Sequence, residues 1–440
     1  MNSRIAQVKF HGLATGGEAV GRDENGKTVF APFGAPDESA RVAIESEKKS
    51  FARGLIQEIA ELSPARADPF CPQFRPQNPE FSCGGCAWQH LELETQREAK
   101  RAIVHDALSR LGGQTVEVEK CRGGAGRAYR NKADFVIGRD QNGAQIGFFA
   151  RESHDLVPAA VCPIQSPHNE AILRAAREIL TDYPDFAFDA ATGRGVWRRL
   201  VARVDTQGET IATLVLAREA KTESVQIAAM LREKLPNLVG VLARTTQNDA
   251  KLVWSRDFLI ENVNDLKFRV SGAAFWQVNA EVSPLLAQTA LEMAQVEPGQ
   301  RALDLFCGAG LFALHLARAG AVVTGIEFHR GAIKDAIFNA KQNGLKADFR
   351  AGDAARELKK HRRGDFDLIL LDPPRAGAAS CLPDLVRLAP ARLVYISCDP
   401  ATLARDAGFL GQNGYKLQRA VPFDLFPQTA HVETAALFVR

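Results

Sequence analysis

The chain has 440 residues, a formal net charge of +3, 46% hydrophobic residues and 24% charged residues. This length predicts two to four domains with ample buried core, and it excludes a short scaffold held together by disulfides. The mildly basic balance excludes a histone-like polycation, so any nucleic-acid contact must be a local patch.

Targeting and cysteine content point to the compartment. The N-terminus lacks a charged region followed by an apolar one, and no window approaches about 18 uninterrupted apolar residues. Eight cysteines in so long a chain favour metal-binding, catalytic or buried roles in a reducing compartment. We therefore expect a soluble, cytoplasmic monomer with no membrane partner.

The N-terminal part is predicted to be all β. Residues 4–60 form short alternating runs separated by Gly, Pro and acidic turn residues. This pattern is typical of a small β-barrel, to which we assign residues 1–64. A break rich in Pro and Cys then marks the end of the barrel.

A central mixed α+β domain is expected over residues 65–270. It opens with a helix over residues 91–111, which places Val104, Leu108 and Leu111 on one face and can pack on the next domain. Strands dominate from about residue 115 onward, interrupted by one amphipathic helix.

The C-terminal part has a different rhythm. From residue 271 to 440, apolar strands alternate with helical stretches. Strands followed regularly by helices predict a doubly wound, Rossmann-like α/β domain with a ligand crevice at the carboxyl ends of its strands.

A cofactor site is predicted at the first of these strands. Asp304-Leu305-Phe306 ends the strand, and Cys307-Gly308-Ala309-Gly310 opens a helix. Glu327 follows 19 residues after Gly308, which suits a pair of ribose hydroxyls. The full G-x-G-x-x-G is missing, so a dinucleotide is disfavoured. Together with Asp372 in DPPR, the pattern favours S-adenosylmethionine.

One further acid and three cysteines are candidates for roles in the same crevice. Asp353 follows the third strand and is either an adenine contact or a surface aspartate. Cys398 ends an apolar strand, which favours a nucleophile over the usual buried cysteine. Cys307 and Cys381 are its rivals, and we interpret both as structural.

A cysteine nucleophile beside a carboxylate base would suit methylation of carbon. The C5 atom of uracil is a poor nucleophile until a thiolate adds to C6, and a base must then remove the C5 proton. Glu433, beside His431, is the candidate base, although a surface glutamate is the alternative for this residue taken alone.

A second cysteine group lies outside this domain. Cys83 and Cys86 form a C-x2-C pair, with Cys71 ahead of it and Cys162 downstream. Four thiolates can hold zinc or an iron–sulfur cluster, and the spacing does not decide between them. Cys121 is the alternative to Cys71 as the fourth ligand.

A basic run forms the candidate RNA contact. Residues 120–132 carry five basic side chains and no acidic one, with Tyr129 among them. Phosphates would contact the charges, and an unstacked base could lie on the tyrosine ring. A solvated loop is the alternative.

Five segments in order resemble the RNA (uracil-5-)-methyltransferases, most closely the type that methylates 23S rRNA. They are FWQVN at 275–279, DLFCGAG at 304–310, LLDPPRAG at 370–377, VYISCDPATLARD at 394–406 and HVET at 431–434. The N-terminal barrel resembles a TRAM domain, an OB-like RNA-binding module.

The resemblance implies a role for each candidate residue. It implies a class I methyltransferase fold with Cys398 as nucleophile and Glu433 as base, and a [4Fe–4S] cluster. Leu311 and Asp399 depart from the asparagines common in the family at these positions. The cofactor and uracil residues implied by the resemblance are Gln277, Phe306, Glu327 and Asp372, and the strand pattern adds Gly308, Gly310 and Asp353 as cofactor contacts. The implied cluster ligands are Cys71, Cys83, Cys86 and Cys162.

The sequence therefore predicts an S-adenosylmethionine-dependent RNA uracil-C5 methyltransferase acting on 23S rRNA. The alternatives are the same chemistry on tRNA and a catalytically silent RNA-binding protein of the same fold. A DNA cytosine-C5 methyltransferase is disfavoured because its Pro-Cys nucleophile motif is missing.

Overall fold

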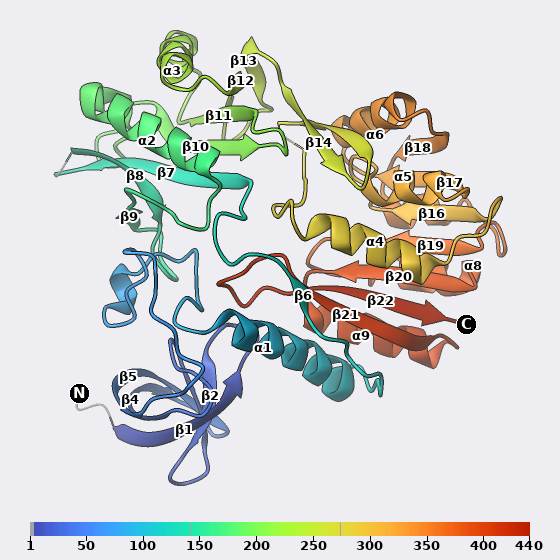
Figure 1. Ribbon diagram of the computed structural model, residues 1–440, viewed down its shortest axis with the longest axis horizontal. Coiled ribbons are helices and arrows are strands. Elements are labelled where there is room, and N and C mark those ends of the chain that lie inside the picture. Colours follow the sequence, from blue (N-terminus) through green and yellow to red (C-terminus); the bar gives the residue numbers. More distant parts are fainter. Residues whose placement is uncertain (1–3, 142, 273) are drawn as a thin grey trace.

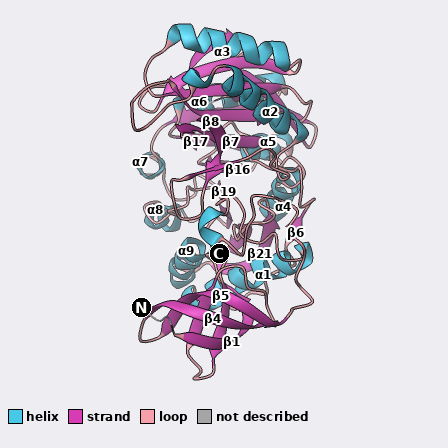
Figure 2. Cartoon of the chain, turned by 90° about the vertical axis from the view of Figure 1, so that its left-hand side faces the viewer, coloured by secondary structure: helices cyan, strands magenta, loops and turns pink. Residues whose placement is uncertain are grey.

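The computed structural model describes residues 4–141, 143–272 and 274–440. The chain forms an N-terminal barrel, a central sheet covered by helices and a C-terminal α/β sheet, which confirms the predicted fold class (Figure 1). Seen from the side, the barrel lies at the bottom of the molecule and helix α3 at the top (Figure 2). No helix within the described ranges has the length and apolar character needed to cross a bilayer.

The barrel is built from strongly alternating strands. In its first strand Ala6, Val8 and Phe10 are buried, and the residues between them are exposed. The strands close in the order β1-β2-β3-β5-β4, so their apolar side chains share one interior. These strands are β1 (Ile5–Leu13), β2 (Ala19–Asp23), β3 (Thr28–Ala31), β4 (Ser39–Glu47) and β5 (Phe51–Glu61).

The central sheet has the order β13-β12-β11-β10-β7-β8-β9, and a separate hairpin, β14-β15, leads from it to the C-terminal domain. Helices α2 and α3 share one core with this sheet. The elements are β7 (Lys132–Asp140), β8 (Gly143–Phe149), β9 (Leu156–Pro158), α2 (Pro167–Asp182), η3 (Pro184–Phe186), β10 (Trp197–Val204), β11 (Thr210–Leu216), α3 (Lys221–Lys234), β12 (Leu238–Thr245), β13 (Lys251–Ser255), β14 (Phe258–Val263) and β15 (Leu266–Ser271).

The C-terminal sheet has the order β18-β17-β16-β19-β20-β22-β21-β6. Strands β16 to β20 pair in parallel, whereas β22 runs antiparallel to both β20 and β21. The elements are α4 (Ser283–Ala294), β16 (Arg301–Leu305), α5 (Leu311–Arg318), β17 (Val322–Glu327), α6 (Arg330–Gln342), β18 (Ala347–Ala351), α7 (Ala354–Leu358), β19 (Leu368–Leu371), α8 (Leu382–Leu388), β20 (Arg392–Ser397), α9 (Pro400–Gln412), β21 (Lys416–Asp424) and β22 (Glu433–Val439).

A segment from earlier in the chain completes this sheet. The short strand β6 (Arg122–Gly123) pairs in parallel with the end of β21, and helix α1 (Leu93–Asp106) lies beneath the same strands in Figure 1. The turn η1 (Pro79–Phe81) precedes α1. The division of the chain at residues 64 and 270 stays a prediction.

The predicted helix face is right for two residues and wrong for the third. Val104 and Leu108 are buried in the core of the C-terminal sheet, whereas Leu111 is 66% exposed. The reason is a π-helical end, η2 (Ala107–Leu111), in which the N–H of Gly112 donates to the carbonyl of Ala107. A π turn is wider than an α turn, so it rotates Leu111 off the buried face.

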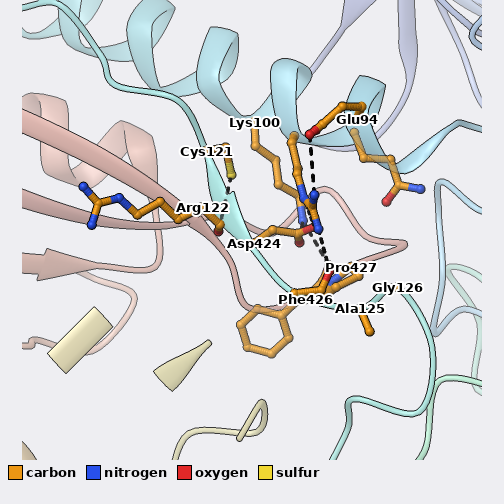
Figure 3. A network of polar contacts seen from close by, with 12 residues as sticks. Glu94, Lys100, Cys121, Arg122, Ala125, Gly126, Asp424, Phe426 and Pro427 are labelled. Atoms are coloured by element: carbon orange, nitrogen blue, oxygen red, sulfur yellow. Dashed lines mark hydrogen bonds and ion pairs between the residues drawn. The ribbon is translucent and has the colours of Figure 1, made fainter. Parts of the chain in front are cut away.

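A buried ion pair joins α1 to the C-terminal sheet. Lys100 projects from α1 to the carboxylate of Asp424 at the end of β21, and both side chains are fully buried (Figure 3). The Lys100 ammonium also donates to the carbonyl of Phe426 at 3.0 Å. Burying two charges is acceptable only where they are paired and hydrogen-bonded, so this contact fixes α1 against the strand.

Candidate active site

The chain turns sharply between β16 and α5. Phe306, Gly308 and Gly310 have φ values of 67°, 53° and 91°, in the left-handed region that favours glycine. Within the described part of the chain, a Cβ added to Gly308 would meet no heavy atom within 4 Å. The backbone therefore borders open space here, and a ligand can approach it closely because glycine has no side chain.

Two acids are fixed beside this turn. The Glu327 carboxylate, at the end of β17, accepts hydrogen bonds from the N–H groups of Gly308 at 3.2 Å and His329 at 2.7 Å. Asp304 is fully buried in β16 and accepts from the N–H of Ala313 at 2.8 Å. Both lie at the carboxyl ends of parallel strands, where sheets of this kind bind ligands.

Two other predicted cofactor residues have different surroundings. Asp353 is exposed and caps α7 by accepting from the N–H of Arg356 at 3.0 Å. Gln277 is buried, and its main-chain carbonyl accepts a hydrogen bond from the Asn131 side chain at 3.1 Å. The helix cap explains the place of Asp353 without a ligand, and the cofactor roles of both residues stay predictions.

Strand register brings Cys398 and Glu433 together. Ser397, the last residue of β20, pairs with Thr434 of β22. The next position on each strand is Cys398 on one side and Glu433 on the other, so the two lie side by side at the sheet end. Asp372 follows the neighbouring strand β19, and its N–H donates to the carbonyl of Leu305 at 3.2 Å.

These three side chains perturb one another's protonation. Burial, and then the carboxylates of Glu433 and Asp372, raise the pKa of the Cys398 thiol to about 11. Burial and Asp372 raise the pKa of Glu433 well above its ordinary value, and burial and Glu327 raise the pKa of Asp372. Effects of like charges fall off with distance, so their presence here indicates that the acids and the thiol lie close together.

Cys398 borders a cavity of about 780 Å³ to which several parts of the chain contribute. The barrel supplies residues 15–17, and the cysteine-rich loop supplies residues 84–87. Four arginines line it as well, and the other lining residues come from the central sheet and from the segment before β22. The arginines are Arg130, Arg151, Arg199 and Arg375. Asp134 and Glu152 line the cavity too and form ion pairs with Arg199 and Arg151. The lining still has more basic than acidic side chains, which together with the thiol suits an anionic substrate that presents an electrophilic carbon.

The four predicted cluster cysteines line one smaller cavity of about 130 Å³. They are Cys71, Cys83, Cys86 and Cys162. Burial raises the pKa of Cys83 to about 11 and of Cys86 to about 12, so burial disfavours the thiolate form of both side chains. No group of three or more His, Cys, Asp or Glu residues in the described ranges is placed to hold a metal ion. The donor set nevertheless fits a thiolate-bound cluster, because all four sulfur-bearing side chains face one space.

The remaining cysteines lie elsewhere. Cys121, the alternative cluster ligand, lies near Lys100 and Asp424 and does not line the cysteine cavity (Figure 3). The structure therefore contradicts Cys121 as a substitute for Cys71. Cys307 and Cys381 are both buried in apolar cores or beside them.

The interpretation of the basic run needs one correction. Tyr129 is only 7% exposed, and its hydroxyl donates to the carbonyl of Pro427 at 3.0 Å. The ring is therefore unable to stack on an RNA base. Arg130 does line the large cavity, whereas the exposed Arg127 lies over the ring of Phe70 at 4.0 Å.

Sequence patterns missed several cavity residues. Arg199 lies in the central sheet, where it forms an ion pair with Asp134 at 2.7 Å, and no motif marks it. Arg375 and His431 stand inside the quoted segments DPPR and HVET, so those segments could have indicated them.

Comparison with known proteins covers nearly the whole chain. Residues 92–440 match the family model described as tRNA (Uracil-5-)-methyltransferase, and residues 1–56 match the TRAM domain. An uncharacterized RNA methyltransferase of Bacillus cereus is 32% identical over 453 residues, covering 100% of this chain and 97% of its own. A Gloeobacter violaceus relative with the same description is also 32% identical, with 100% and 97% covered.

Among solved structures, the tRNA (uracil-54, C5)-methyltransferase of Pyrococcus abyssi, in complex with S-adenosyl-L-homocysteine, has a similar fold. Its TM-score is 0.77, with 22% identity and 99% of each chain covered. At this identity the likeness concerns the fold, and it includes the N-terminal barrel.

The carboxylates of Glu433 and Asp372 should affect the rate at which the Cys398 thiol is alkylated. Burial and the negative charges of the neighbouring carboxylates raise the pKa of the Cys398 thiol to about 11, because they oppose formation of the thiolate. Replacing Glu433 by Gln removes the larger of these charges, so the pKa of Cys398 falls and alkylation by iodoacetamide at pH 8–10 becomes faster. Mass spectrometry of the Cys398 peptide measures the rate. Asp372→Asn should act in the same direction, and Asp367→Asn, at a surface pair with Arg301, should change nothing. An unchanged or slower rate in Glu433→Gln would contradict the shared site.

Proposed function

The chain belongs to the RNA (uracil-5-)-methyltransferase family, and we propose that it methylates C5 of a uridine in 23S rRNA through Cys398 and Glu433. That it is an S-adenosylmethionine-dependent RNA uracil-5-methyltransferase follows from the family match over residues 92–440. The proposal concerns the residues that perform the chemistry, the cluster and the RNA.

The observation that carries the proposal is the pairing of β20 with β22. It sets a thiol beside a carboxyl group at the sheet end, next to a turn suited to a cofactor. In our proposal the Cys398 thiolate adds to C6 of uracil, and C5 becomes an enolate-like nucleophile. Bound S-adenosylmethionine supplies the electrophilic methyl group and a positive charge.

Glu433 then completes the reaction. Its carboxylate takes the C5 proton, the electrons of that C–H bond restore the C5–C6 double bond, and the C6–sulfur bond breaks to release Cys398. The raised pKa of Glu433 supports this role, because such a carboxylate is a stronger proton acceptor than an exposed one.

The cofactor is proposed to lie on the turn after β16. The open space beside Gly308 leaves room for it, and Glu327 is already held by two backbone N–H groups. A carboxylate in that position would accept hydrogen bonds from ribose hydroxyls. Gln277, Phe306, Gly310, Asp353 and Asp372 are the other proposed contacts.

The cysteine cavity is proposed to hold a [4Fe–4S] cluster. Its thiolates would neutralise part of the iron charge, which removes the cost of burying them as anions. The cluster would join the loop carrying Cys71, Cys83 and Cys86 to the segment carrying Cys162. We assign the cluster a structural role. By holding Cys86 it would fix residues 84–87, which also line the cavity that contains Cys398.

The choice of 23S rRNA rests on the resemblance of the ordered motifs and of the cysteine set. The barrel does not separate the two RNA classes, because the Pyrococcus tRNA enzyme matches this fold over 99% of the chain, barrel included. The target base must leave its stack to reach Cys398, which favours a loop or a remodelled strand.

The roles of Cys398 and Glu433 can be tested by trapping. Cys398→Ala should abolish turnover and leave no covalent adduct, because the first bond is never formed. Glu433→Gln keeps the size of the side chain and removes the base, so it should methylate and then stall as a protein–RNA complex. Denaturing gels with methyl-tritiated S-adenosylmethionine detect that complex. Normal turnover in Glu433→Gln would exclude it as the base, and an unmethylated adduct would place its role before methyl transfer.

The cluster can be tested by metal content. Protein purified without oxygen should be brown and contain about four irons per chain. Cys86→Ser should lose iron and weaken stability or RNA binding more than it slows methyl transfer, and Cys121→Ser should keep its iron. Colourless protein with one zinc, or loss of iron in Cys121→Ser, would contradict the assignment.

The RNA substrate can be tested by mapping. In a strain lacking the protein, m5U should disappear at a 23S rRNA uridine and remain in tRNA, and the wild-type gene should restore it while Cys398→Ala should not. Loss of m5U from tRNA would indicate the tRNA alternative, and no loss anywhere would indicate a silent RNA-binding protein.

A further inference from the structure

One loop lies at the centre of the proposed chemistry. Residues 425–432, which we call the base loop, connect β21 to β22 and end directly before Glu433. Phe426 and Thr429 to Val432 also line the cavity that contains Cys398. The position of the carboxyl group therefore depends on how this loop is held.

The base loop is held from outside. Four consecutive carbonyl oxygens each accept a hydrogen bond from a segment before residue 280. The carbonyl of Leu425 accepts from the Asn279 side chain at 3.3 Å, that of Phe426 from Lys100 at 3.0 Å, that of Pro427 from the Tyr129 hydroxyl at 3.0 Å, and that of Gln428 from the N–H groups of Ala87 at 2.8 Å and Trp88 at 3.0 Å.

The donors are themselves fixed. Lys100 is held by its buried ion pair with Asp424, and Figure 3 shows it reaching from α1 towards Phe426 and Pro427. Tyr129 lies between Ala128 and Arg130, whose N–H groups donate to the carbonyls of Pro163 and Ile164. The base loop is therefore held by side chains whose own positions are fixed by neighbouring segments, and not only by contacts within its own turn.

The Tyr129 hydrogen bond can run in only one direction. A carbonyl oxygen only accepts, so the hydroxyl must donate, and burial raises the pKa of Tyr129 so that the proton stays in place. No RNA base can replace this contact, because the ring is buried.

We infer that Tyr129 is a positioning residue for Glu433, acting through its hydroxyl on the Pro427 carbonyl of the base loop. The inference rests on the proposed role of Glu433 as the base. Proton transfer requires the carboxylate within hydrogen-bond reach of the C5 proton, so a loop that moves slightly slows this step more than the others.

The chain provides a matched control. Tyr415 is also buried, and its hydroxyl donates at 2.9 Å to the carbonyl of Pro390, which lies outside the base loop. Tyr129→Phe and Tyr415→Phe each remove one buried hydroxyl from a proline carbonyl and keep the ring. Their effects on stability should be similar, so a difference in chemistry is specific to the base loop.

The experiment compares the two variants in single turnovers on total RNA from a strain lacking the protein, with methyl-tritiated S-adenosylmethionine. Tyr129→Phe should slow the breakdown of the methylated adduct about threefold to tenfold. This is the factor that corresponds to the loss of one hydrogen bond. Methylated covalent adduct should accumulate in proportion, while the KM for S-adenosylmethionine and RNA affinity stay unchanged. Amides of residues 425–432 should exchange hydrogen faster in Tyr129→Phe than in Tyr415→Phe.

Three results would overturn the inference. They are equal adduct levels in the two variants, unchanged amide exchange in the base loop, and a loss of RNA affinity in Tyr129→Phe, which would return the ring to RNA contact. Glu433→Gln serves as the reference. If that variant forms no methylated adduct, the proposed base is wrong; if it does and Tyr129→Phe matches Tyr415→Phe, only the positioning role fails.

Discussion

The site depends on the antiparallel pairing of β20 with β22. Side chains alternate along a strand, so a slip of one residue would turn either Cys398 or Glu433 to the opposite face. Packing on both faces fixes the register. Val394 and Ile396 lie in one buried core with Ala435, and Leu393 and Tyr395 lie in another with Ala436. The hydrophobic pattern of two strands thereby determines which reactive groups meet.

This meeting carries an electrostatic cost. Asp304, Glu327, Asp372 and Glu433 gather at the ends of neighbouring strands, and burial raises the pKa of Asp304 well above its ordinary value as well. A buried group of acids disfavours further negative charge and favours a cation. The sulfonium of S-adenosylmethionine is such a cation, and the thiolate of Cys398 would form more readily with it in place. The acids can therefore serve binding and activation together.

Much of the fold was predictable because local patterns determine it. The barrel follows from alternation within short strands, and the cofactor turn follows from Gly308 and Gly310 beside an apolar strand. Long-range contacts were not predictable in the same way. The sequence pattern puts Leu111 on a buried face because a π turn leaves no clear sequence signal. It offers Tyr129 as an RNA contact because its partner, Pro427, lies 298 residues away. Arg199 was missed for the same reason, since only the folded chain brings it to the cavity.

The two halves of the site differ in how they are supported. The turn after β16, where we propose that the cofactor binds, is stabilised within the C-terminal domain. The backbone N–H groups of Gly308, Phe306 and Asp372 donate hydrogen bonds to Glu327, Ile326 and Leu305, respectively. The base loop instead takes its donors from the cysteine-rich loop, from α1, from the basic run and from Asn279. Residues 84–87 and Arg130 from these regions line the cavity that contains Cys398. In our proposal, parts of the chain that meet RNA therefore also position the base. If Glu433 is the base, as we propose, a nucleotide bound against these regions would also influence its position.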